Sequence, residues 1–231
     1  MVEARATGAG LTPDAAVAKA QAIYTPLSLR FYDLVVHGLS NRFAWRCPTQ
    51  ALVRLYEDTL SANHLEAGVG TGLLINRAGR AAFDRLVLLD INRNCLASAQ
   101  RRLARYGPQI RQASLFDPLP GDLGVFESIG LTYVLHCLPG RLPEKLSVLD
   151  RLRPLMAERD VLFGATILGR GVEANGAARA LFRLYNRKGV FNNLEDDGEA
   201  LEAGLSQRFT DVEVERKGCV ALFRAASSRK L

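Results

Sequence analysis

The chain has 231 residues and a net charge of +6, from 30 Lys and Arg against 24 Asp and Glu. Hydrophobic residues make up 48% and charged residues 23%, which excludes a disordered, collagen-like or coiled-coil chain. No apolar run reaches the roughly 18–20 residues that a membrane-spanning helix requires, so we expect no membrane partner. The modest positive charge permits an acidic partner without demanding one.

The four cysteines are widely spaced and form no C-x-x-C pair; they are Cys47, Cys95, Cys137 and Cys219. Such spacing predicts neither a zinc site nor a disulfide framework. The first ten residues also lack the apolar core of a secretory signal. We therefore expect a cytoplasmic protein with reduced thiols.

Residues 1–60 are predicted to be helical, in segments 12–23, 27–36 and 50–60, with His37-Gly38 ending the second and Thr49 capping the third. Beyond Asn63, strands and helices alternate. Strands are expected at 64–67, 86–89, 110–113, 125–131, 161–167, 212–215 and 220–223, and helices at 72–79, 93–106, 142–155, 176–187 and 197–209. This order predicts an α/β fold with a doubly wound, mostly parallel seven-stranded sheet that ends in an antiparallel hairpin. We expect one domain over 61–231, preceded by a helical extension over 1–60.

A glycine-rich turn between a strand and a helix is the strongest motif, with the sequence Glu66-Ala67-Gly68-Val69-Gly70-Thr71-Gly72. Glycines let the backbone bend sharply and let a ligand approach the main chain, although a tight turn without a ligand is the alternative. A dinucleotide fingerprint would need glycine where the chain has Leu73, and the Gly-Lys-Ser/Thr of a P-loop is absent. The Glu66 carboxylate would repel a pyrophosphate but suits a cationic or amino-bearing ligand.

A second acidic residue, Asp90, ends the next predicted strand, eighteen residues after Gly72. An acid at that place can accept hydrogen bonds from both hydroxyls of a ribose. The alternative role is an N-cap for the following helix, and it is weakened because Asn92 can cap that helix itself.

These motifs, together with the fourth-strand segment Phe126-Glu127-Ser128-Ile129, resemble those of the class I S-adenosylmethionine-dependent methyltransferases over about residues 60–225. The resemblance implies a Rossmann-like fold and S-adenosylmethionine as cofactor, with S-adenosylhomocysteine as product. It implies cofactor contacts from Glu66, Gly68, Gly70, Asp90, Ile91, Ser114, Leu115 and Leu131. The chain departs from the family at Ser114, where Asp is common.

The resemblance also bears on the substrate. The fourth strand ends in Gly130-Leu131-Thr132-Tyr133, unlike the Pro-Pro-aromatic sequence of base-methylating members, so nucleic acid is disfavoured. The segment Ala165-Thr166-Ile167-Leu168 lacks the acids of the catechol type, so no metal is expected. Helices like those of the N-terminal region form a lid in similar small-molecule enzymes. The candidate substrate-binding residues are Tyr24, Tyr32, Trp45 and Tyr133, with core packing as the alternative for each.

His136 is the candidate general base because imidazole titrates near neutral pH, with a structural role as an equal alternative. Tyr32 is a second candidate catalytic residue. We expect O- or N-methylation of a small molecule in a biosynthetic pathway. Two alternatives stay open: an RNA methyltransferase, motivated by the arginines between positions 101 and 111, and a cofactor-binding protein that does not methylate. The sequence gives no indication of oligomeric state.

Overall fold

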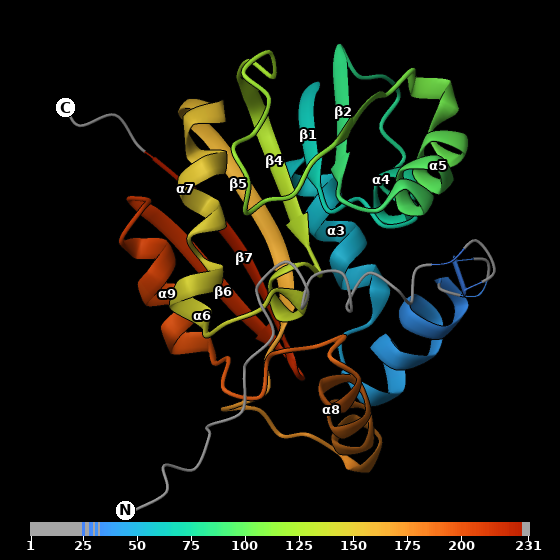
Figure 1. Ribbon diagram of the computed structural model, residues 1–231, viewed down its shortest axis with the longest axis vertical. Coiled ribbons are helices and arrows are strands. Elements are labelled where there is room, and N and C mark those ends of the chain that lie inside the picture. The colour runs from blue at the N-terminus through green and yellow to red at the C-terminus, as the bar shows by residue number, and fades with distance from the viewer. Residues whose placement is uncertain (1–24, 26–27, 30, 32, 228–231) are drawn as a thin grey trace, which may run out of the picture.

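The computed structural model describes residues 25, 28–29, 31 and 33–227. Its sheet has seven strands in the order β3-β2-β1-β4-β5-β7-β6 (Figure 1). The strands are β1 Asn63–Ala67, β2 Arg85–Asp90, β3 Gln109–Gln112, β4 Phe126–Thr132, β5 Met156–Ile167, β6 Asp211–Lys217 and β7 Val220–Ala226. The first five are parallel, and β7 is antiparallel to both of its neighbours. The predicted doubly wound α/β fold with a terminal hairpin is therefore confirmed.

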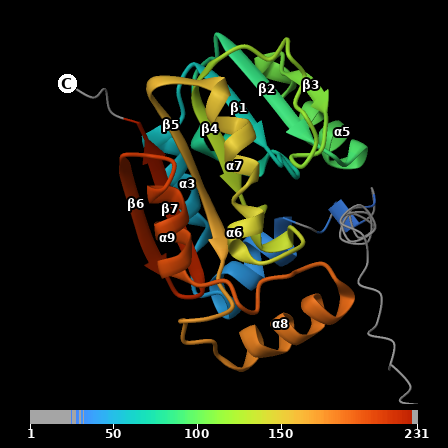
Figure 2. The same ribbon diagram turned by 60° about the vertical axis from the view of Figure 1, so that its left-hand side comes forward.

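Helices cover both faces of the sheet. The helices are η1 Asp33–Ala44, α3 Thr49–Thr59, α4 Leu73–Ala78, α5 Arg93–Arg102, α6 Leu142–Lys145, α7 Val148–Leu152, α8 Gly176–Lys188 and α9 Gly198–Ser206, with single turns η2 Ala104–Tyr106, η3 Leu135–Cys137 and η4 Arg153–Leu155. One face packs against α3, α4 and α5, and the other against α6, α7 and α9 (Figures 1 and 2). In the part of the chain that the structure describes, no helix combines the length and apolar character needed to cross a membrane.

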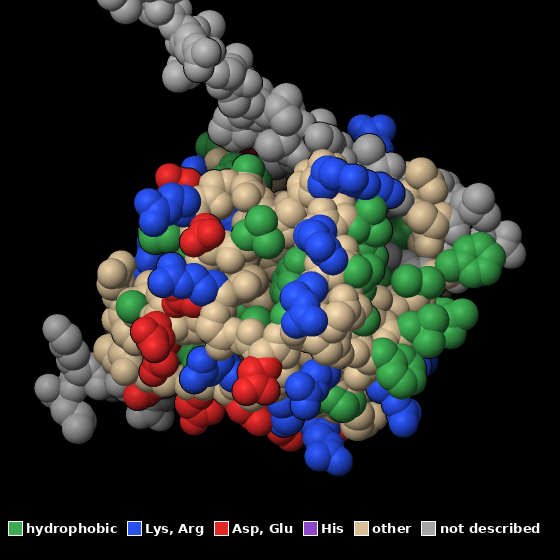
Figure 3. Space-filling view, turned by 90° about the horizontal axis from the view of Figure 1, so that it is seen from below, with side chains coloured by type: hydrophobic (Ala, Val, Ile, Leu, Met, Phe, Trp, Pro, Cys, Tyr) green, Lys and Arg blue, Asp and Glu red, His purple; other side chains and the backbone are tan. Residues whose placement is uncertain are grey.

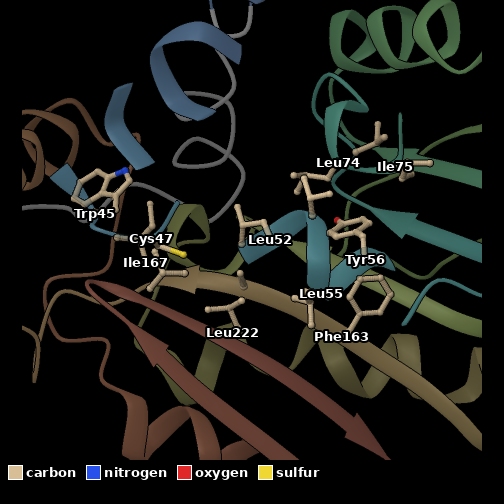
Figure 4. Packing of buried hydrophobic residues seen from close by; sticks show 14 of the residues in the cluster. Trp45, Cys47, Leu52, Leu55, Tyr56, Leu74, Ile75, Phe163, Ile167 and Leu222 are labelled. Atoms are coloured by element: carbon tan, nitrogen blue, oxygen red, sulfur yellow. The ribbon is translucent and has the colours of Figure 1, made fainter. Parts of the chain in front are cut away.

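Helix α3 packs directly on the sheet. Leu52, Leu55 and Tyr56 point from α3 toward Phe163 and Ile167 of β5 (Figure 4). The Tyr56 ring meets the Phe163 ring edge-on, with centroids 5.0 Å apart. Aromatic pairs in this geometry add to the stabilisation that burial provides. Helix α3 thus shares the core of the sheet, while a separate extension over 1–60 stays a prediction.

The N-terminal helices differ from prediction at two points. Helix η1 does not end at His37-Gly38 but continues to Ala44 with wide, π-type hydrogen bonding. A helical glycine costs only about 1 kcal/mol relative to alanine, and the buried hydrogen bonds of Asn41 offset it. Thr49 lies inside α3 rather than capping it, because Pro48 occupies the N-cap position. Its hydroxyl donates instead to the carbonyl of His37. The predicted helix over 12–23 lies outside the described residues.

Candidate active site

A cavity lies at the carboxyl edge of the sheet, where β1, β2 and β4 end together. The register pairs Glu66 of β1 with Gly130 of β4, and Asp90 of β2 with Gln112 of β3. The space between the elements is about 1080 Å³, including the part open to solvent, which is ample for a small ligand. The cavity brings together eight predicted site residues: Glu66, Gly68, Gly70, Asp90, Ile91, Ser114, Leu115 and Tyr133.

The glycine-rich turn forms one wall of the cavity, and its glycines have different tasks. Gly68, at φ +79°, packs so closely that an added Cβ would lie 2.3 Å from Cγ2 of Val134. Gly70, at φ +54°, has no atom within 4 Å of the same position. Because Gly70 lines the cavity, a side chain there would take up space that a ligand could occupy.

Asp90 joins β2 to the glycine-rich turn. Its Oδ1 accepts a 2.8 Å hydrogen bond from the amide of Asn92, and its Oδ2 accepts one of 3.3 Å from the amide of Gly70. Burial raises the pKa of Asp90 to about 6, against the lowering effect of these hydrogen bonds. Helix α5 is capped by the Asn92 side chain, which accepts from the amides of Asn94 and Cys95. Asp90 is therefore not needed as the cap.

The Glu66 carboxylate lines the cavity and is held there by two side chains. Tyr56 donates to Oε1 at 2.6 Å, and Nε2 of His64 donates to Oε2 at 3.0 Å. The second ring nitrogen of His64 lies 2.8 Å from the Ser128 hydroxyl, so the imidazole is also fixed. Gly130 leaves the necessary room, because a Cβ there would lie 2.4 Å from Oε2. Burial and the adjacent carboxylate hold the pKa of Tyr56 well above its usual range.

Tyr133 and His37 lie side by side in the cavity lining. Tyr133 has a backbone φ of +61°, which is rare for a bulky residue and marks a conformation held by its surroundings. Its amide donates to the Ala165 carbonyl at 2.7 Å, and its hydroxyl donates to Asn41 Oδ1 at 2.9 Å. The His37 ring lies nearly parallel to the Tyr133 ring, at 9° with centroids 6.1 Å apart. Both side chains line the cavity.

Helix η1 is tied to the glycine-rich turn by three polar side chains. Arg102 of α5 donates to Thr71 Oγ1 at 2.9 Å and pairs with Asp33 Oδ2 at 2.6 Å. The Thr71 hydroxyl in turn donates to Asp33 Oδ1 at 2.6 Å. We refer to Asp33, Thr71 and Arg102 as the latch. It joins the start of η1 to the cavity wall.

Several predicted site residues lie elsewhere. Trp45 is buried in the core against Phe182 and Phe191 and does not line the cavity. Leu131 is buried on the opposite face of the sheet, and its neighbour Thr132 reaches the cavity instead. Tyr24 and Tyr32 lie outside the described residues. The core position of Trp45 agrees with the alternative that the sequence left open.

His136 is also outside the cavity lining. Its ring contacts Phe191 with centroids 4.5 Å apart, and its Nδ1 accepts a 3.3 Å hydrogen bond from the amide of Ile167. Burial, together with the charge of Lys145, lowers the pKa of His136 to about 3. This arrangement favours the structural alternative over the predicted role as general base.

Sequence reasoning missed two polar residues of the cavity, His37 and Tyr56. Tyr56 belongs to the apolar stripe of α3, and nothing in its spacing sets it apart from core residues. His37 was interpreted only as part of a helix end. No local pattern indicates that either residue faces the glycine-rich turn, because their positions depend on how α3 and η1 pack.

The lining fits the cofactor that the sequence predicted. A carboxylate, Glu66, faces the cavity at one place and a second, Asp90, at another, which suits an ammonium group and a ribose. Ile91 and Leu115 also line the cavity, and their apolar side chains suit the faces of an adenine ring. The open space beside Gly70 leaves the main chain accessible to the connecting part of such a molecule.

Comparisons with known proteins agree with this class of site. No family model matches the chain. Demethylluteothin O-methyltransferase of Streptomyces thioluteus is 36% identical over 213 residues, which cover 92% of this chain and 93% of that protein. The Physcion biosynthesis cluster O-methyltransferase of Aspergillus chevalieri is 35% identical over 206 residues, 88% of this chain and 93% of its own. Among solved structures, the complex of DhpI with SAH has a TM-score of 0.63 at 16% identity, covering 95% of this chain and 100% of that one.

The fold, the glycine-rich turn and the acid that ends β2 define a class I methyltransferase. The identity to relatives over most of both chains shows the family. The chain belongs to the S-adenosylmethionine-dependent methyltransferases of the small-molecule type.

Proposed function

We propose that this chain transfers the methyl group of S-adenosylmethionine to a hydroxyl oxygen of a small, planar metabolite in a biosynthetic pathway. One observation carries the proposal: a single cavity is lined both by the Glu66 and Asp90 carboxylates and by the nearly parallel rings of His37 and Tyr133. The names of the two sequence relatives, both O-methyltransferases, support oxygen as the acceptor atom. Nitrogen is the alternative acceptor.

Each predicted cofactor contact has a distinct task in this proposal. Glu66 would bind the ammonium group, Asp90 the ribose hydroxyls, and Ile91 and Leu115 the adenine faces. The hydroxyl of Ser114 accepts from the amide of Phe116 at 3.1 Å, so Ser114 shapes the turn beside the adenine region. When bound, the cofactor supplies a methyl group activated by a positively charged sulfur. The chain then has to align the acceptor, exclude water and remove a proton.

The arginines at positions 101–111 support a small molecule over RNA. Arg102 belongs to the latch, and Arg105 donates to Tyr106 Oη at 2.8 Å while its guanidinium lies over that ring. Arg111 pairs with Asp122 at 3.4 Å. Three of these four arginines thus have partners within the protein, while Arg101 is exposed. A phosphate-binding surface requires cations that are available to the nucleic acid.

The exposed surface beside the site is apolar rather than purely basic. Figure 3 shows the face seen from below, where hydrophobic side chains gather toward one edge and acidic side chains toward the opposite one. On η1, the side chains of Leu34, Leu39 and Phe43 are each more than half exposed, at 63%, 52% and 60%. An apolar surface suits an apolar acceptor better than it suits a phosphate backbone.

A two-stage measurement tests the proposal. Calorimetric titration with S-adenosylhomocysteine is expected to give one-site binding, and Asp90→Ala is expected to weaken it by roughly 10- to 150-fold. Incubation with cofactor carrying a deuterated methyl group and a panel of phenols and enols, followed by mass spectrometry, is expected to give labelled ethers. Binding without transfer to any acceptor would favour a non-methylating role, and transfer to RNA alone would favour the nucleic-acid alternative.

A further inference from the structure

One histidine, His37 of η1, lies among the residues that line the cavity. His37 lines the cavity together with Tyr133, and the two rings are nearly parallel. His136, in contrast, lies outside the cavity lining, among aromatic side chains. The chain has three histidines. The remaining one, His64, has its two ring nitrogens within hydrogen-bond distance of Glu66 and Ser128.

We propose that His37 is the catalytic residue that takes the proton from the acceptor hydroxyl. The inference rests on the proposed function and names its acceptor more narrowly, as a phenol or enol whose flat ring lies beside the rings of His37 and Tyr133. As the acceptor oxygen forms its bond to the methyl carbon, the bond between that carbon and sulfur breaks. The electron pair of that bond stays on the sulfur, which becomes neutral in S-adenosylhomocysteine, and the hydroxyl proton moves to a ring nitrogen of His37.

The position of His37 is fixed by its neighbours on two sides. Its carbonyl accepts a hydrogen bond from the Thr49 hydroxyl, which also accepts from the Asn41 amide at 3.0 Å. Asn41 in turn accepts from the Tyr133 hydroxyl, so the backbone of His37 and the ring it stacks on belong to one buried network. Four residues earlier, Asp33 binds η1 to the cavity wall through the latch. Such fixation is what a proton acceptor requires, because proton transfer depends on geometry before it depends on pKa.

Burial, more than the nearby charges, keeps the imidazole of His37 neutral. Asp33 on its own helix favours the protonated form, whereas Arg77 of α4 and Arg102 of α5 oppose it. Burial has the largest effect, and the pKa of His37 is lowered to about 4. The neutral imidazole can accept a hydrogen bond from the acceptor hydroxyl, and it takes the proton as the oxygen bonds to the methyl carbon, when that proton becomes strongly acidic. Arg102 is itself neutralised in part by Asp33, so the balance depends on the latch.

The acidity of the acceptor provides a sharp test. 4-Nitrophenol is largely ionised at mildly alkaline pH and needs no base, whereas 4-methoxyphenol keeps its proton. His37→Phe retains a ring against Tyr133 but cannot accept a proton. We expect this variant to methylate 4-methoxyphenol about 10²- to 10⁴-fold more slowly than the parent, the usual contribution of a general base, while 4-nitrophenol changes only a few-fold. Arg42→Gln, at an exposed position of the same helix and outside the cavity lining, serves as the matched control and should leave both rates unchanged.

A second readout does not require turnover. With S-adenosylhomocysteine bound, the parent enzyme should bind 4-methoxyphenol about three- to tenfold more tightly than 1,4-dimethoxybenzene, because only the phenol can donate a hydrogen bond to the neutral imidazole of His37. His37→Phe should bind the two compounds equally, while its affinity for S-adenosylhomocysteine stays within about threefold. Equal losses of rate for both phenols, or an unchanged preference for 4-methoxyphenol, would overturn the role of His37. A parent enzyme that binds no S-adenosylhomocysteine would instead contradict the proposed function.

Discussion

The hydroxyl of Tyr56 donates a 2.6 Å hydrogen bond to Oε1 of Glu66, and this bond joins α3 to the end of β1. Both side chains are buried, at 1% and 3% exposure, so the bond forms away from bulk water. The helix that packs on β5 through its apolar stripe therefore also orients an acid of the cavity lining. The packing of α3 and the position of a predicted cofactor-binding carboxylate are linked through this one contact.

Tyr56→Phe removes the hydroxyl and leaves Glu66 with one donor fewer. We expect the free energy of unfolding to fall by about 1.5–3 kcal/mol, the usual range for a hydrogen bond to a charged group. Affinity for S-adenosylhomocysteine should fall by about tenfold because Glu66 is no longer held on that side. Urea unfolding and calorimetric titration measure the two effects.

Tyr106→Phe is the matched control for this prediction. The Tyr106 hydroxyl donates to the Arg80 carbonyl at 2.7 Å, away from the cavity lining. This variant should lose stability without losing affinity. If Tyr56→Phe bound the ligand as tightly as the parent does, Tyr56 would have a structural role alone.

The sheet could be predicted closely because its signals are local. A run such as Leu86 to Leu89, followed by an acid, is buried on both faces and could only be a central strand. The same holds for the glycine-rich turn, whose residues are adjacent in sequence and therefore adjacent in space. The predicted cofactor contacts from Glu66 to Asp90 follow from these two features.

The acceptor side could not be predicted in the same way, because it depends on contacts between distant segments. Tyr133 bonds to Asn41, which is 92 positions away, and His37 meets Tyr133 only because η1 crosses the end of β4. His136 carries a residue type suited to catalysis, but packing against Phe191 takes it out of the cavity. Trp45 could not be placed from the sequence either. It packs against Phe182 in the core, and an aromatic residue in a candidate lid has no local feature that distinguishes it from a core residue.

The raised pKa of Asp90 leads to a prediction about pH. In the folded protein its pKa is about 6, against an ordinary value of 3.8 for an aspartate, so the native state binds a proton more tightly than the unfolded chain. The contribution of Asp90 to stability is therefore full below about pH 4 and is lost as pH rises through 6. Ribose hydroxyls would donate to the ionised form. Affinity for S-adenosylhomocysteine should thus fall by up to about tenfold for each pH unit below 6.

Calorimetric titration across this pH range measures the effect, and Asp90→Asn should abolish it by removing the titrating group. Asp117→Asn, at an exposed acid after β3, should leave the pH dependence as in the parent. A parent affinity that does not change between pH 4 and 7 would contradict the assignment of Asp90 to the ribose.

The latch predicts coupling between η1 and the glycine-rich turn. Asp33 and Arg102 are 23% and 29% exposed, so solvent weakens their attraction only in part. Asp33→Asn and Arg102→Gln should each destabilise the protein, and the double variant should be less destabilised than the sum by about 1 kcal/mol. Each single variant should also raise the KM for the acceptor, because η1 is less firmly held over the cavity.

Arg101→Gln changes an exposed arginine next to Arg102 in α5. It should change neither the free energy of unfolding nor the KM for the acceptor. A double-mutant cycle measured by urea unfolding, together with initial rates at varied acceptor concentration, gives both results. Strict additivity, with an unchanged KM, would mean that the latch is a surface ion pair without influence on the site.

The last prediction compares two glycines with the same backbone conformation. Gly70 and Gly107 have φ values of +54° and +58°, and a Cβ added at either position would meet no atom within 4 Å. Alanine in this left-handed conformation costs roughly 1–2 kcal/mol, so both Gly70→Ala and Gly107→Ala should lower the free energy of unfolding by that amount.

Of these two glycines, only Gly70 lines the cavity. Gly70→Ala should therefore weaken S-adenosylhomocysteine binding by at least tenfold, since its methyl group would occupy the space beside the turn, while Gly107→Ala binds as the parent does. Equal affinities in the two variants would show that the ligand does not approach the main chain at Gly70, and the cofactor contact assigned to this glycine would have to be withdrawn.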